Sequence, residues 1–443
     1  MTDMRTLDSY GMKWMGTVPD NWSIFPTKRH FDIQLGKMLQ NTPEANDDCA
    51  VPYLKAVNVL WGRVNTEDAP EMWANPDEIM SYEVRDGDLL VCEGGEVGRA
   101  GIVRNPPDRC IIQNALHRVR ARNSSSVSFL MYVLHSVDSS GWFDVLCNKA
   151  TIAHFTGEKF AELRVPLPSP KRQRAIATFL DRETSRIDEL IAKKQRQIEL
   201  LQEKRSALIS HVVTKGLDPN VKMKDSGVEW LGEIPEHWEA VRFKFVLSEP
   251  LQYGANESAE YDEPSWPRYV RITDINENGN LREETFKSLP EDVAQPYLLR
   301  DGDLLLARSG ATVGKTFLYM KSWGSAAYAG YLIRSRFQQK CMFPAFSAYF
   351  CRSSNYWDWL KSSFIQATIQ NVSAERYANM VVPMPPIDDQ KAIVTFLDTE
   401  TAHIDTLIEK VEKSIELLRE YRTALVSAAV TGKIDVREEV PAS

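Results

Sequence analysis

Residues 14–22 read Trp14-Met15-Gly16-Thr17-Val18-Pro19-Asp20-Asn21-Trp22, and residues 230–238 read Trp230-Leu231-Gly232-Glu233-Ile234-Pro235-Glu236-His237-Trp238. The two segments share the spacing of their tryptophans, their glycine and their proline. Internal repetition is the first feature to establish, because it decides how often one folding unit is used. This repeat predicts a chain built from two sequential copies of one domain arrangement.

Two further pairs of segments extend the repeat along the chain. Arg85-Asp86-Gly87-Asp88-Leu89-Leu90 returns as Arg300-Asp301-Gly302-Asp303-Leu304-Leu305, and Thr178-Phe179-Leu180-Asp181 returns as Thr395-Phe396-Leu397-Asp398. Only small insertions separate the copies. Two such copies are expected to be related by a pseudo-two-fold, which suits a partner with a two-fold of its own, such as duplex DNA.

Composition limits the possible classes of protein. The chain has 443 residues, of which 43% are hydrophobic and 26% charged, as in ordinary globular proteins. No apolar run approaches the ~18 residues of a membrane span, and residues 1–10 are too polar for a signal peptide. The six cysteines have neither metal-site nor disulfide-framework spacing. We therefore expect a cytoplasmic chain with free thiols, no bound metal and no membrane contact.

The net charge of −8 argues against a protein that holds nucleic acid by bulk positive charge alone. If DNA is the ligand, a partner is expected to supply part of the phosphate contact.

Each copy consists of a globular part followed by a long helix. The globular parts, residues 1–168 and 221–386, contain short apolar runs entered from Asp-Gly turns, which predicts α+β domains. The helical parts are residues 169–220 and 387–443, the second including a C-terminal tail. Within them, Lys171–Lys215 and Asp388–Thr431 contain no glycine or proline and are bracketed by both. The predicted fold class is α+β, with two pseudo-symmetric globular domains joined by two long antiparallel coiled-coil helices.

The two helical segments have heptad spacing, which predicts a narrow apolar seam against another helix. The candidate pairing residues are Ile187, Ile191, Ile198, Leu201 and Leu208 in the first helix, and Ile404, Ile408, Ile415, Leu418 and Leu425 in the second. The first helix is basic overall and the second acidic, which favours pairing of the two with each other. At 1.5 Å per residue each would be roughly 65 Å long and would act as a ruler. An ordinary helical hairpin or a homodimer interface remains an alternative.

Two segments imitate catalytic motifs without completing them. Ser309-Gly310-Ala311-Thr312-Val313-Gly314-Lys315-Thr316 ends like a phosphate-binding loop, but serine replaces its first glycine and no long helical pattern follows. Asn105-Pro106-Pro107-Asp108 is similar to the Asn-Pro-Pro-aromatic motif of DNA amino-methyltransferases, but it lacks the aromatic residue that stacks on a flipped base. We therefore predict a chain that catalyses nothing by itself.

Polar and basic residues at matching places in both copies are the candidates for DNA contact, since arginine pairs with guanine or phosphate and Asn or Gln with adenine. The candidates are Lys55, Asn58, Arg99, Gln113, Asn114, Arg118, Arg120 and Lys149 in the first copy, and Arg271, Thr273, Arg308, Lys315, Arg334, Arg336 and Gln366 in the second. The alternative is a solvated strand face with ordinary salt bridges.

Two more doubled patterns, together with those above, identify a family. They are Gly-x-x-Trp-x-Gly-x-x-Pro-x-x-Trp at Gly11–Trp22 and Gly227–Trp238, and Pro-x-Pro-x-x-x-x-Gln-x-x-Ile at Pro166–Ile176 and Pro383–Ile393. With these motifs in order and twice, the chain resembles the specificity subunit of type I restriction-modification systems from Gly11 to Asp435.

The resemblance implies a role in phage defence, with each globular part as a target recognition domain that reads one half of a bipartite, asymmetric site in double-stranded DNA. It implies that the helices set the unread gap and dock two methyltransferase subunits, with restriction (translocase) subunits joining for cleavage. S-adenosylmethionine, ATP and Mg would then be bound by those partners and no cofactor by this chain. The copies diverge most at 100–112 and 316–328, which predicts two different half-sites. A stand-alone methyltransferase or nuclease, and a coiled-coil scaffold that binds only protein, are the alternatives.

Overall fold

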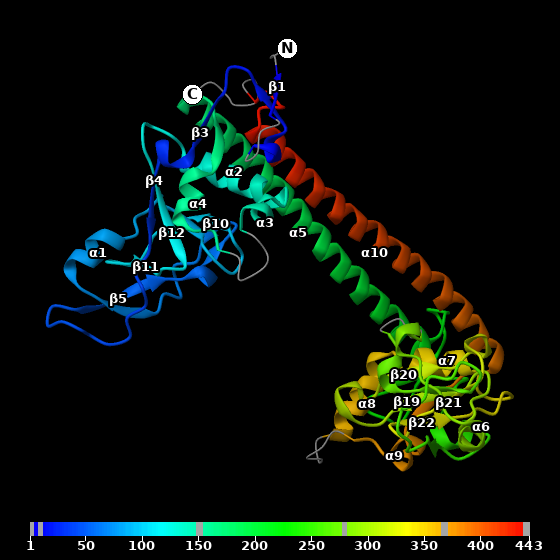
Figure 1. Cartoon of the computed structure of the whole chain (residues 1–443). Coiled ribbons are helices and arrows are strands. Elements are labelled where there is room, and N and C mark those ends of the chain that lie inside the picture. The colour runs from blue at the N-terminus through cyan, green and yellow to red at the C-terminus, as the bar shows by residue number, and fades with distance from the viewer. Residues whose placement is uncertain (1–3, 8–11, 148–153, 277–280, 365–370, 437–443) are drawn as a thin grey trace. The chain divides into compact units, whose positions relative to one another are not determined.

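The computed structural model describes residues 4–7, 12–147, 154–276, 281–364 and 371–436. It divides into two compact units (Figure 1). Unit 1 comprises Met1–Lys194 with Lys413–Ser443, and unit 2 comprises Gln195–Glu412. Each unit contains one globular domain together with part of both long helices.

The domain of unit 1 is built on a six-stranded sheet. Across the sheet its strands are β4 (Phe31–Leu35), β12 (Leu116–Ala121), β9 (Leu89–Cys92), β10 (Ala100–Ile102), β7 (Gly62–Val64) and β6 (Val59–Leu60). Neighbours run antiparallel except β10 and β7, which are parallel. Strand β9, the apolar run after the first Asp-Gly turn, is buried at all four positions.

Smaller elements complete this domain. The strands are β1 (Met4–Thr6) with β2 (Thr17–Pro19), β3 (Ser23–Pro26) with β13 (Arg164–Leu167), and β11 (Ile111–Ile112) with β5 (Cys49–Leu54) and β8 (Glu71–Ala74). The helices are α1 (Pro76–Tyr82), α2 (Val127–Ser139), α3 (Trp142–Cys147) and α4 (Gly157–Glu162). Helix α2 begins where the Ser126 hydroxyl accepts a hydrogen bond from the amide of Phe129, and its apolar face joins the main core.

The domain of unit 2 repeats this plan with a four-stranded sheet. Its strands are, in order, β17 (Gln252–Tyr253), β22 (Leu332–Ser335), β19 (Leu304–Ala307) and β20 (Thr316–Leu318). The accompanying pairs are β18 (Arg268–Val270) with β21 (Ala326–Tyr328), β16 (Glu239–Arg242) with β23 (Val381–Met384), and β14 (Met223–Asp225) with β15 (Glu233–Pro235). The helices are α6 (Glu291–Ala294), α7 (Pro344–Phe350), α8 (Ser354–Phe364) and α9 (Ala374–Ala378). The pairing of β22 with β17 and β19 matches that of β12 with β4 and β9.

The two long helices are α5 (Pro170–Lys215) and α10 (Ile387–Val430). Gly216 directly follows α5 and Gly432 lies two residues after α10, and both have a positive φ, a conformation that disfavours other residues. The helices run antiparallel. In unit 1, α5 is linked to α10 and the residues after it by Arg172–Asp435 at 3.5 Å and Asp188–Arg422 at 3.0 Å, and in unit 2 Arg205–Asp405 links them at 3.1 Å. The predicted fold class is thereby confirmed.

The helix seam is narrow. Of the ten predicted pairing residues, Ile187, Ile404 and Ile415 are buried and the other seven are half-buried. Nearby apolar side chains outside the seam, such as Leu200 and Leu417, are exposed. Half-burial of seam residues such as Ile198 is the geometry expected for a two-helix pair, whereas Leu208 and Leu425 also pack against the main core of a domain.

Each domain is anchored to the start of its following helix by the same contacts. Tyr132 of α2 donates its hydroxyl to Asp181 at 2.7 Å, and Tyr349 of α7 donates to Asp398 at 2.6 Å. Burial raises the pKa of both tyrosines, so they remain neutral donors. The Gln173 side chain likewise accepts from the amide of Ser126 and donates to Pro168, as Gln390 does with Phe343 and Pro385. These contacts explain why the Gln-x-x-Ile and Thr-Phe-Leu-Asp segments occur twice.

All six cysteines are free. Across the residues that the structure describes, no helix has the combination of length and apolar character needed to cross a membrane.

Candidate nucleic-acid interface

One edge of the main sheet gathers the same set of loops in both domains. In unit 1, Leu35 at the end of β4 lies opposite His117, and Cys92 at the end of β9 lies opposite Leu116. The segments 36–38, 93–99 and 113–115 therefore meet there, and we call them the first loop edge. In unit 2 the corresponding segments, 254–256, 308–315 and 329–331, form the second loop edge.

Both loop edges are tied by the same backbone hydrogen bonds. In the first they run from Lys37 N to Ile112 O (2.8 Å), Asn114 N to Lys37 O (2.8 Å), Leu116 N to Gln113 O (2.9 Å) and Glu93 N to Ala115 O (2.9 Å). In the second they run from Ala255 N to Tyr328 O (2.8 Å), Gly330 N to Ala255 O (2.6 Å), Leu332 N to Ala329 O (2.9 Å) and Arg308 N to Tyr331 O (3.0 Å). One backbone arrangement thus presents two different sets of side chains.

A glycine makes each of these close approaches possible. A Cβ atom at Gly36 would lie 2.3 Å from the carbonyl oxygen of Gln113, and one at Gly254 would lie 2.3 Å from that of Tyr328. Real side chains do not tolerate such contacts with backbone atoms, so both positions require glycine.

The first loop edge brings together several of the predicted contact residues. Gln113 and Asn114 are half-buried, and their side-chain amides have no hydrogen-bond partner among the described residues. A bond from Gln113 N to Leu54 O at 3.0 Å places Lys55 beside them. Arg99 opposes Cys92 at the same edge, but its guanidinium is fixed by Glu96 at 2.7 Å and by the Ala56 carbonyl at 3.0 Å.

Asn58 has an internal role. Its side chain is 3% exposed, accepts from the amide of Lys55 and donates to the carbonyls of Asn65 and Asp68. Its equivalent Asp274 is also buried and accepts from the amide and guanidinium of Arg271, with 2.7 Å between Arg271 Nη2 and Asp274 Oδ1. These two residues organise the turn that positions Lys55 and Arg271.

The remaining accessible candidates lie in unit 2, Arg308 and Lys315 on the second loop edge and Thr273 in the turn after Arg271. Thr273 and Lys315 are exposed, and Arg308 is half-buried with its guanidinium 4.7 Å from the ring centroid of Tyr253. Lys149 and Gln366 lie outside the described residues.

The strand arginines of unit 1 are engaged inside their domain. Arg118 is 6% exposed and donates to the carbonyls of Ser81 and Glu83 at 3.0 and 2.6 Å. Arg120 makes a two-pronged contact with Asp88 at 2.7 and 2.8 Å, which raises the pKa of Arg120.

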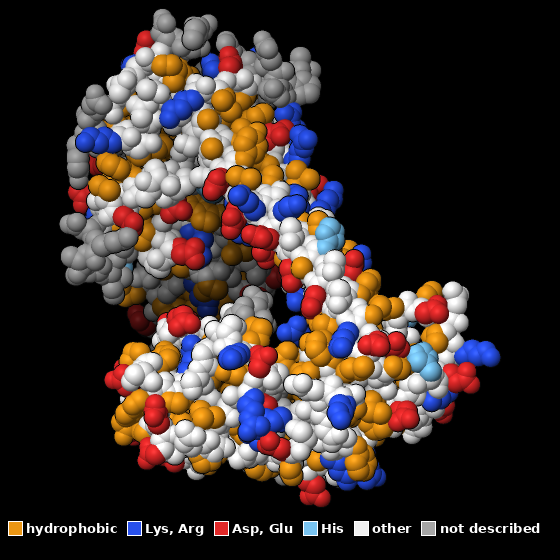
Figure 2. Space-filling view, turned by 90° about the vertical axis from the view of Figure 1, so that its right-hand side faces the viewer, with side chains coloured by type: hydrophobic (Ala, Val, Ile, Leu, Met, Phe, Trp, Pro, Cys, Tyr) orange, Lys and Arg blue, Asp and Glu red, His pale blue; other side chains and the backbone are white. Residues whose placement is uncertain are grey.

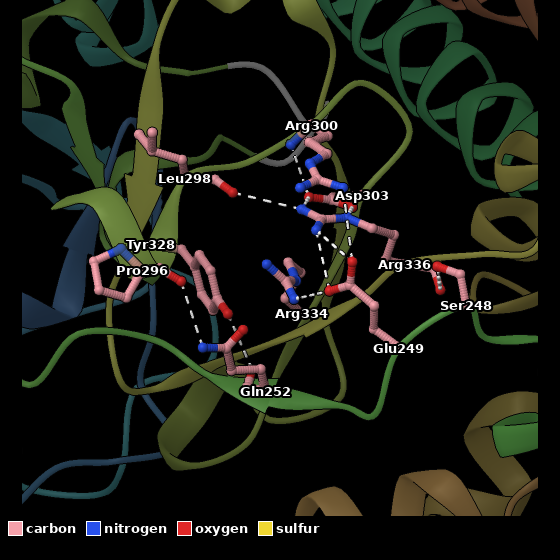
Figure 3. Close-up of polar contacts among 10 residues, drawn as sticks. All are labelled: Ser248, Glu249, Gln252, Pro296, Leu298, Arg300, Asp303, Tyr328, Arg334 and Arg336. Atoms are coloured by element: carbon pink, nitrogen blue, oxygen red, sulfur yellow. Dashed lines mark hydrogen bonds and ion pairs between the residues drawn. The ribbon is translucent and has the colours of Figure 1, made fainter.

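The strand arginines of unit 2 form a denser cluster, shown in Figure 3. Arg336 binds both oxygens of the buried Asp303 at 2.8 and 2.7 Å, and Arg334 reaches Glu249 at 2.8 Å. Glu249 also accepts from Arg336 at 3.0 Å, and these hydrogen bonds and charges lower the pKa of Glu249. Asp88 and Asp303 also accept hydrogen bonds from the backbone amides of Arg85 and Arg300. The last aspartate of each Arg-Asp-Gly-Asp repeat therefore stabilises the turn and at the same time binds an arginine of the neighbouring strand.

Sequence reasoning missed several residues of the loop edges. Met38 is 73% exposed and Tyr331 is 65% exposed, so both are accessible for contact. They were missed because no sequence motif marks their loops. Glu93 of the first loop edge and Tyr253, the last residue of β17 just before the second, were also missed. The only signal that could have found them is the alignment of the two copies loop by loop, because their equivalence lies in backbone hydrogen bonding.

The two imitation motifs are structural. Gly310–Thr312 forms a short 3-10 turn, and strand β20 begins at Thr316, where a phosphate-binding loop would continue as a helix. Residues 105–108 lie in a loop between β10 and β11. Within the described ranges, no group of three or more metal-binding side chains occurs.

Charges of both signs are interspersed on the face of the molecule in Figure 2. A single basic surface does not cover this face, in keeping with the net charge of −8.

A family model described as the type I restriction modification DNA specificity domain matches residues 19–200 and 251–417. The chain belongs to this family of type I restriction-modification specificity subunits. The resemblance that the sequence motifs indicated is therefore confirmed, and a DNA specificity subunit is supported over a stand-alone enzyme or a protein-only scaffold.

Two curated relatives match this specificity subunit over most of its length. The chain is 26% identical to the type I restriction enzyme MjaVIII specificity subunit of Methanocaldococcus jannaschii, over 79% of this chain and 79% of the relative. It is 20% identical to the type I restriction enzyme EcoBI specificity subunit of Escherichia coli, over 94% of this chain and 87% of the relative.

Two solved structures share the fold. One comes from work on complex assembly and conformational transition of the type I R-M system, with a TM-score of 0.72 at 16% identity, covering 94% of this chain and 99% of the other. The second is the HsdS subunit of Thermoanaerobacter tengcongensis, with a TM-score of 0.57 at 16% identity, covering 94% of this chain and 98% of the other.

Proposed function

We propose that this specificity subunit reads a bipartite, asymmetric site in double-stranded DNA, with one half-site at each loop edge. The observation that carries the proposal is the doubled backbone with unlike side chains, such as Asn114 at the place of Gly330 and Ala115 at the place of Tyr331. Sequence is read by side-chain donors, acceptors and apolar groups at base edges. The same scaffold with different groups therefore favours two different half-sites.

The helices would set the gap between the half-sites. Helix α5 is unbroken over 46 residues and α10 over 44, and each passes through both units. A helix rises 1.5 Å per residue, so its length converts directly into a separation. The antiparallel partner and the ion pairs at Asp188 and Asp405 support a fixed register.

The partners would be two methyltransferase subunits docked on the helices, with restriction (translocase) subunits joining for cleavage. S-adenosylmethionine, ATP and Mg would be bound by those partners. The net charge of −8 supports this division, because DNA phosphates require cationic surface that this chain does not supply in bulk.

Genome-wide mapping of methylated bases by long-read sequencing tests the proposal. The native strain, a deletion of this gene and a complemented deletion would be compared, with the modification subunits expressed in all three. We expect one bipartite motif with a fixed gap and unlike halves to disappear in the deletion and return on complementation. An unchanged set of methylated motifs would overturn the proposal.

A further inference from the structure

The side chain of Arg308, on the second loop edge, is held in place by two neighbouring residues. Its guanidinium carbon lies 4.7 Å from the ring centroid of Tyr253, and its Nε donates to Asn371 Oδ1 at 3.5 Å. Its two Nη groups have no hydrogen-bond partner among the described residues. The two Nη groups are therefore available as donors, while Nε is hydrogen-bonded to Asn371 and one face of the guanidinium packs on Tyr253.

The backbone of Arg308 is equally fixed. Its amide donates to the carbonyl of Tyr331 at 3.0 Å, and its carbonyl accepts from the amide of Val372 at 2.8 Å. Tyr253 is 39% exposed, and its hydroxyl in turn accepts from the amide of Ala374 at 3.0 Å. An arginine held in this way loses little conformational entropy on binding, which favours a contact with defined geometry.

Guanine is the base that matches this group. Its O6 and N7 atoms are paired acceptors in the major groove, and a guanidinium supplies two parallel N–H donors at the matching spacing. A phosphate could also accept from Arg308, but a phosphate contact does not require a guanidinium plane fixed by an aromatic ring.

Glu93 occupies the equivalent position on the first loop edge. Its amide donates to Ala115 O at 2.9 Å, and its carbonyl accepts from Phe155 N at 2.7 Å, as in Arg308. Its carboxylate has no hydrogen bond or ion pair with any described residue, and Leu35 stands where Tyr253 stands in unit 2. An ionised carboxylate only accepts hydrogen bonds, so it cannot bind the acceptors of guanine but suits the N4 amino group of cytosine.

We propose that Arg308 reads a guanine in the second half-site and that Glu93, at the same backbone position, selects a base with an amino group in the first. The inference rests on the proposed function, because it assigns bases to loop edges that are proposed to face DNA. Tyr253 acts as a positioning residue for Arg308.

The first experiment measures competition binding to the complex of this subunit with its modification subunits. Each guanine of the second half-site is replaced in turn by 7-deazaguanine, which lacks the N7 acceptor. We expect about tenfold weaker binding at one guanine, the range of one good base contact. In the complex carrying Arg308→Ala the same replacement should have no further effect. The assignment is overturned if no guanine behaves in this way.

A phosphate contact would give a different result. Arg308→Ala would then weaken binding to all duplexes alike and reduce the slope of log affinity against log salt by about one. That outcome would also overturn the assignment. Tyr253→Phe should preserve the 7-deazaguanine effect because it retains the ring, whereas Tyr253→Ala should diminish it.

Methylated motifs in strains carrying single variants provide the second test. Arg308→Ala should relax one guanine of the second half-site, and Glu93→Gln should change one position of the first half-site alone. Absence of a bipartite motif with the unaltered chain would contradict the proposed function itself. A normal motif that Arg308→Ala leaves unchanged would contradict only the assignment. If Arg308→Ala abolishes methylation, the 7-deazaguanine series with the unaltered complex decides.

Discussion

Arg205 Nη1 lies 3.1 Å from Asp405 Oδ1 in unit 2, and Arg422 makes the same contact with Asp188 in unit 1 at 3.0 Å. Arg205 and Arg422 are equivalent positions of the repeat, as are Asp188 and Asp405. All four side chains are partly exposed, so each pair contributes only ~0.2–1 kcal/mol. These pairs matter more for the register of the two helices than for stability, because an arginine and an aspartate align α5 with α10 in the same way in both units.

Lengthening both helices together should lengthen the gap in the DNA site. Seven residues would be inserted between Lys194 and Gln195 and seven between Glu412 and Lys413, which preserves the heptad phase. Each helix grows by ~10.5 Å, about three base-pair steps of 3.4 Å. We expect unchanged half-sites with a gap about three base pairs longer, read by methylation mapping. Slower methylation is also expected, because three base pairs rotate a half-site by roughly 100° about the duplex. Altered half-site sequences would contradict the hypothesis that helix length sets only the gap between the half-sites.

Removing a buried seam side chain should loosen the helix pair. Ile404 is 2% exposed, so Ile404→Ala should lower the free energy of unfolding by ~2–5 kcal/mol through lost burial and a residual cavity. Leu417 on the same helix is 57% exposed, so Leu417→Ala should change the free energy of unfolding by less than ~0.5 kcal/mol. Urea denaturation followed by circular dichroism measures both. Equal effects would show that the seam is not the packed face.

Two glycines in one turn should differ in their tolerance of a methyl group. Gly95 and Gly98 both have positive φ, but a Cβ at Gly98 would lie 2.1 Å from the Phe143 ring and one at Gly95 meets nothing within 4 Å. Gly95→Ala should cost ~1–2 kcal/mol for the backbone conformation alone. Gly98→Ala should cost ~2–5 kcal/mol, because overpacking is added. Thermal unfolding of the two variants provides the comparison, and equal losses would contradict this account.

Arg336 should matter for stability more than for base reading. Arg336→Ala leaves the buried Asp303 without its charge partner, so we expect a loss of ~3–5 kcal/mol. Arg300 is 72% exposed and 3.7 Å from Glu249, so Arg300→Ala should cost less than ~1 kcal/mol. Unfolding curves give the stabilities, and methylation mapping should give an unchanged motif for both. A stable Arg336→Ala chain with an altered motif would instead favour the DNA contact predicted from sequence.

Acid should destabilise unit 1 through His135. Burial and the nearby Arg422 charge, at 3.3 Å from its Nε2, lower the pKa of His135 to about 4, against a partial opposing effect of Asp188. Between pH 6.5 and 4 the unfolded chain therefore binds a proton that the folded chain does not, and stability falls with falling pH. At pH 5 the loss is about 2 kcal/mol relative to pH 7.5. Urea unfolding at the two pH values measures it, and His135→Gln should flatten the difference. An equally steep dependence in that variant would assign it to other groups.

The architecture could be predicted because its signals are local. Helices α5 and α10 begin and end within one residue of the predicted stretches 171–215 and 388–431, since proline and glycine mark both ends. The apolar run after Asp88 forms β9 for the same reason, because an Asp-Gly turn precedes it.

The site could be predicted only in part, because the roles of its residues depend on distant partners. Arg120 and Arg336 look like accessible arginines in sequence, but their partners Asp88 and Asp303 lie more than thirty residues away. Alternation along a strand does not reveal which side chains find such a partner. Tyr253 and Arg308 stack across a sheet edge, and neither belongs to a recognisable motif.

The core of unit 1 has a consequence for how the chain is made. Its buried cluster includes Val426, Ala429 and Val430, from the last turns of α10, packed with residues such as Trp22 and Ile176. A growing polypeptide cannot supply those three side chains until it has been synthesised as far as residue 430. The globular domain of unit 1 is thus synthesised before that of unit 2 but completes its core after it, and its apolar surface is exposed to chaperones or to aggregation in the meantime.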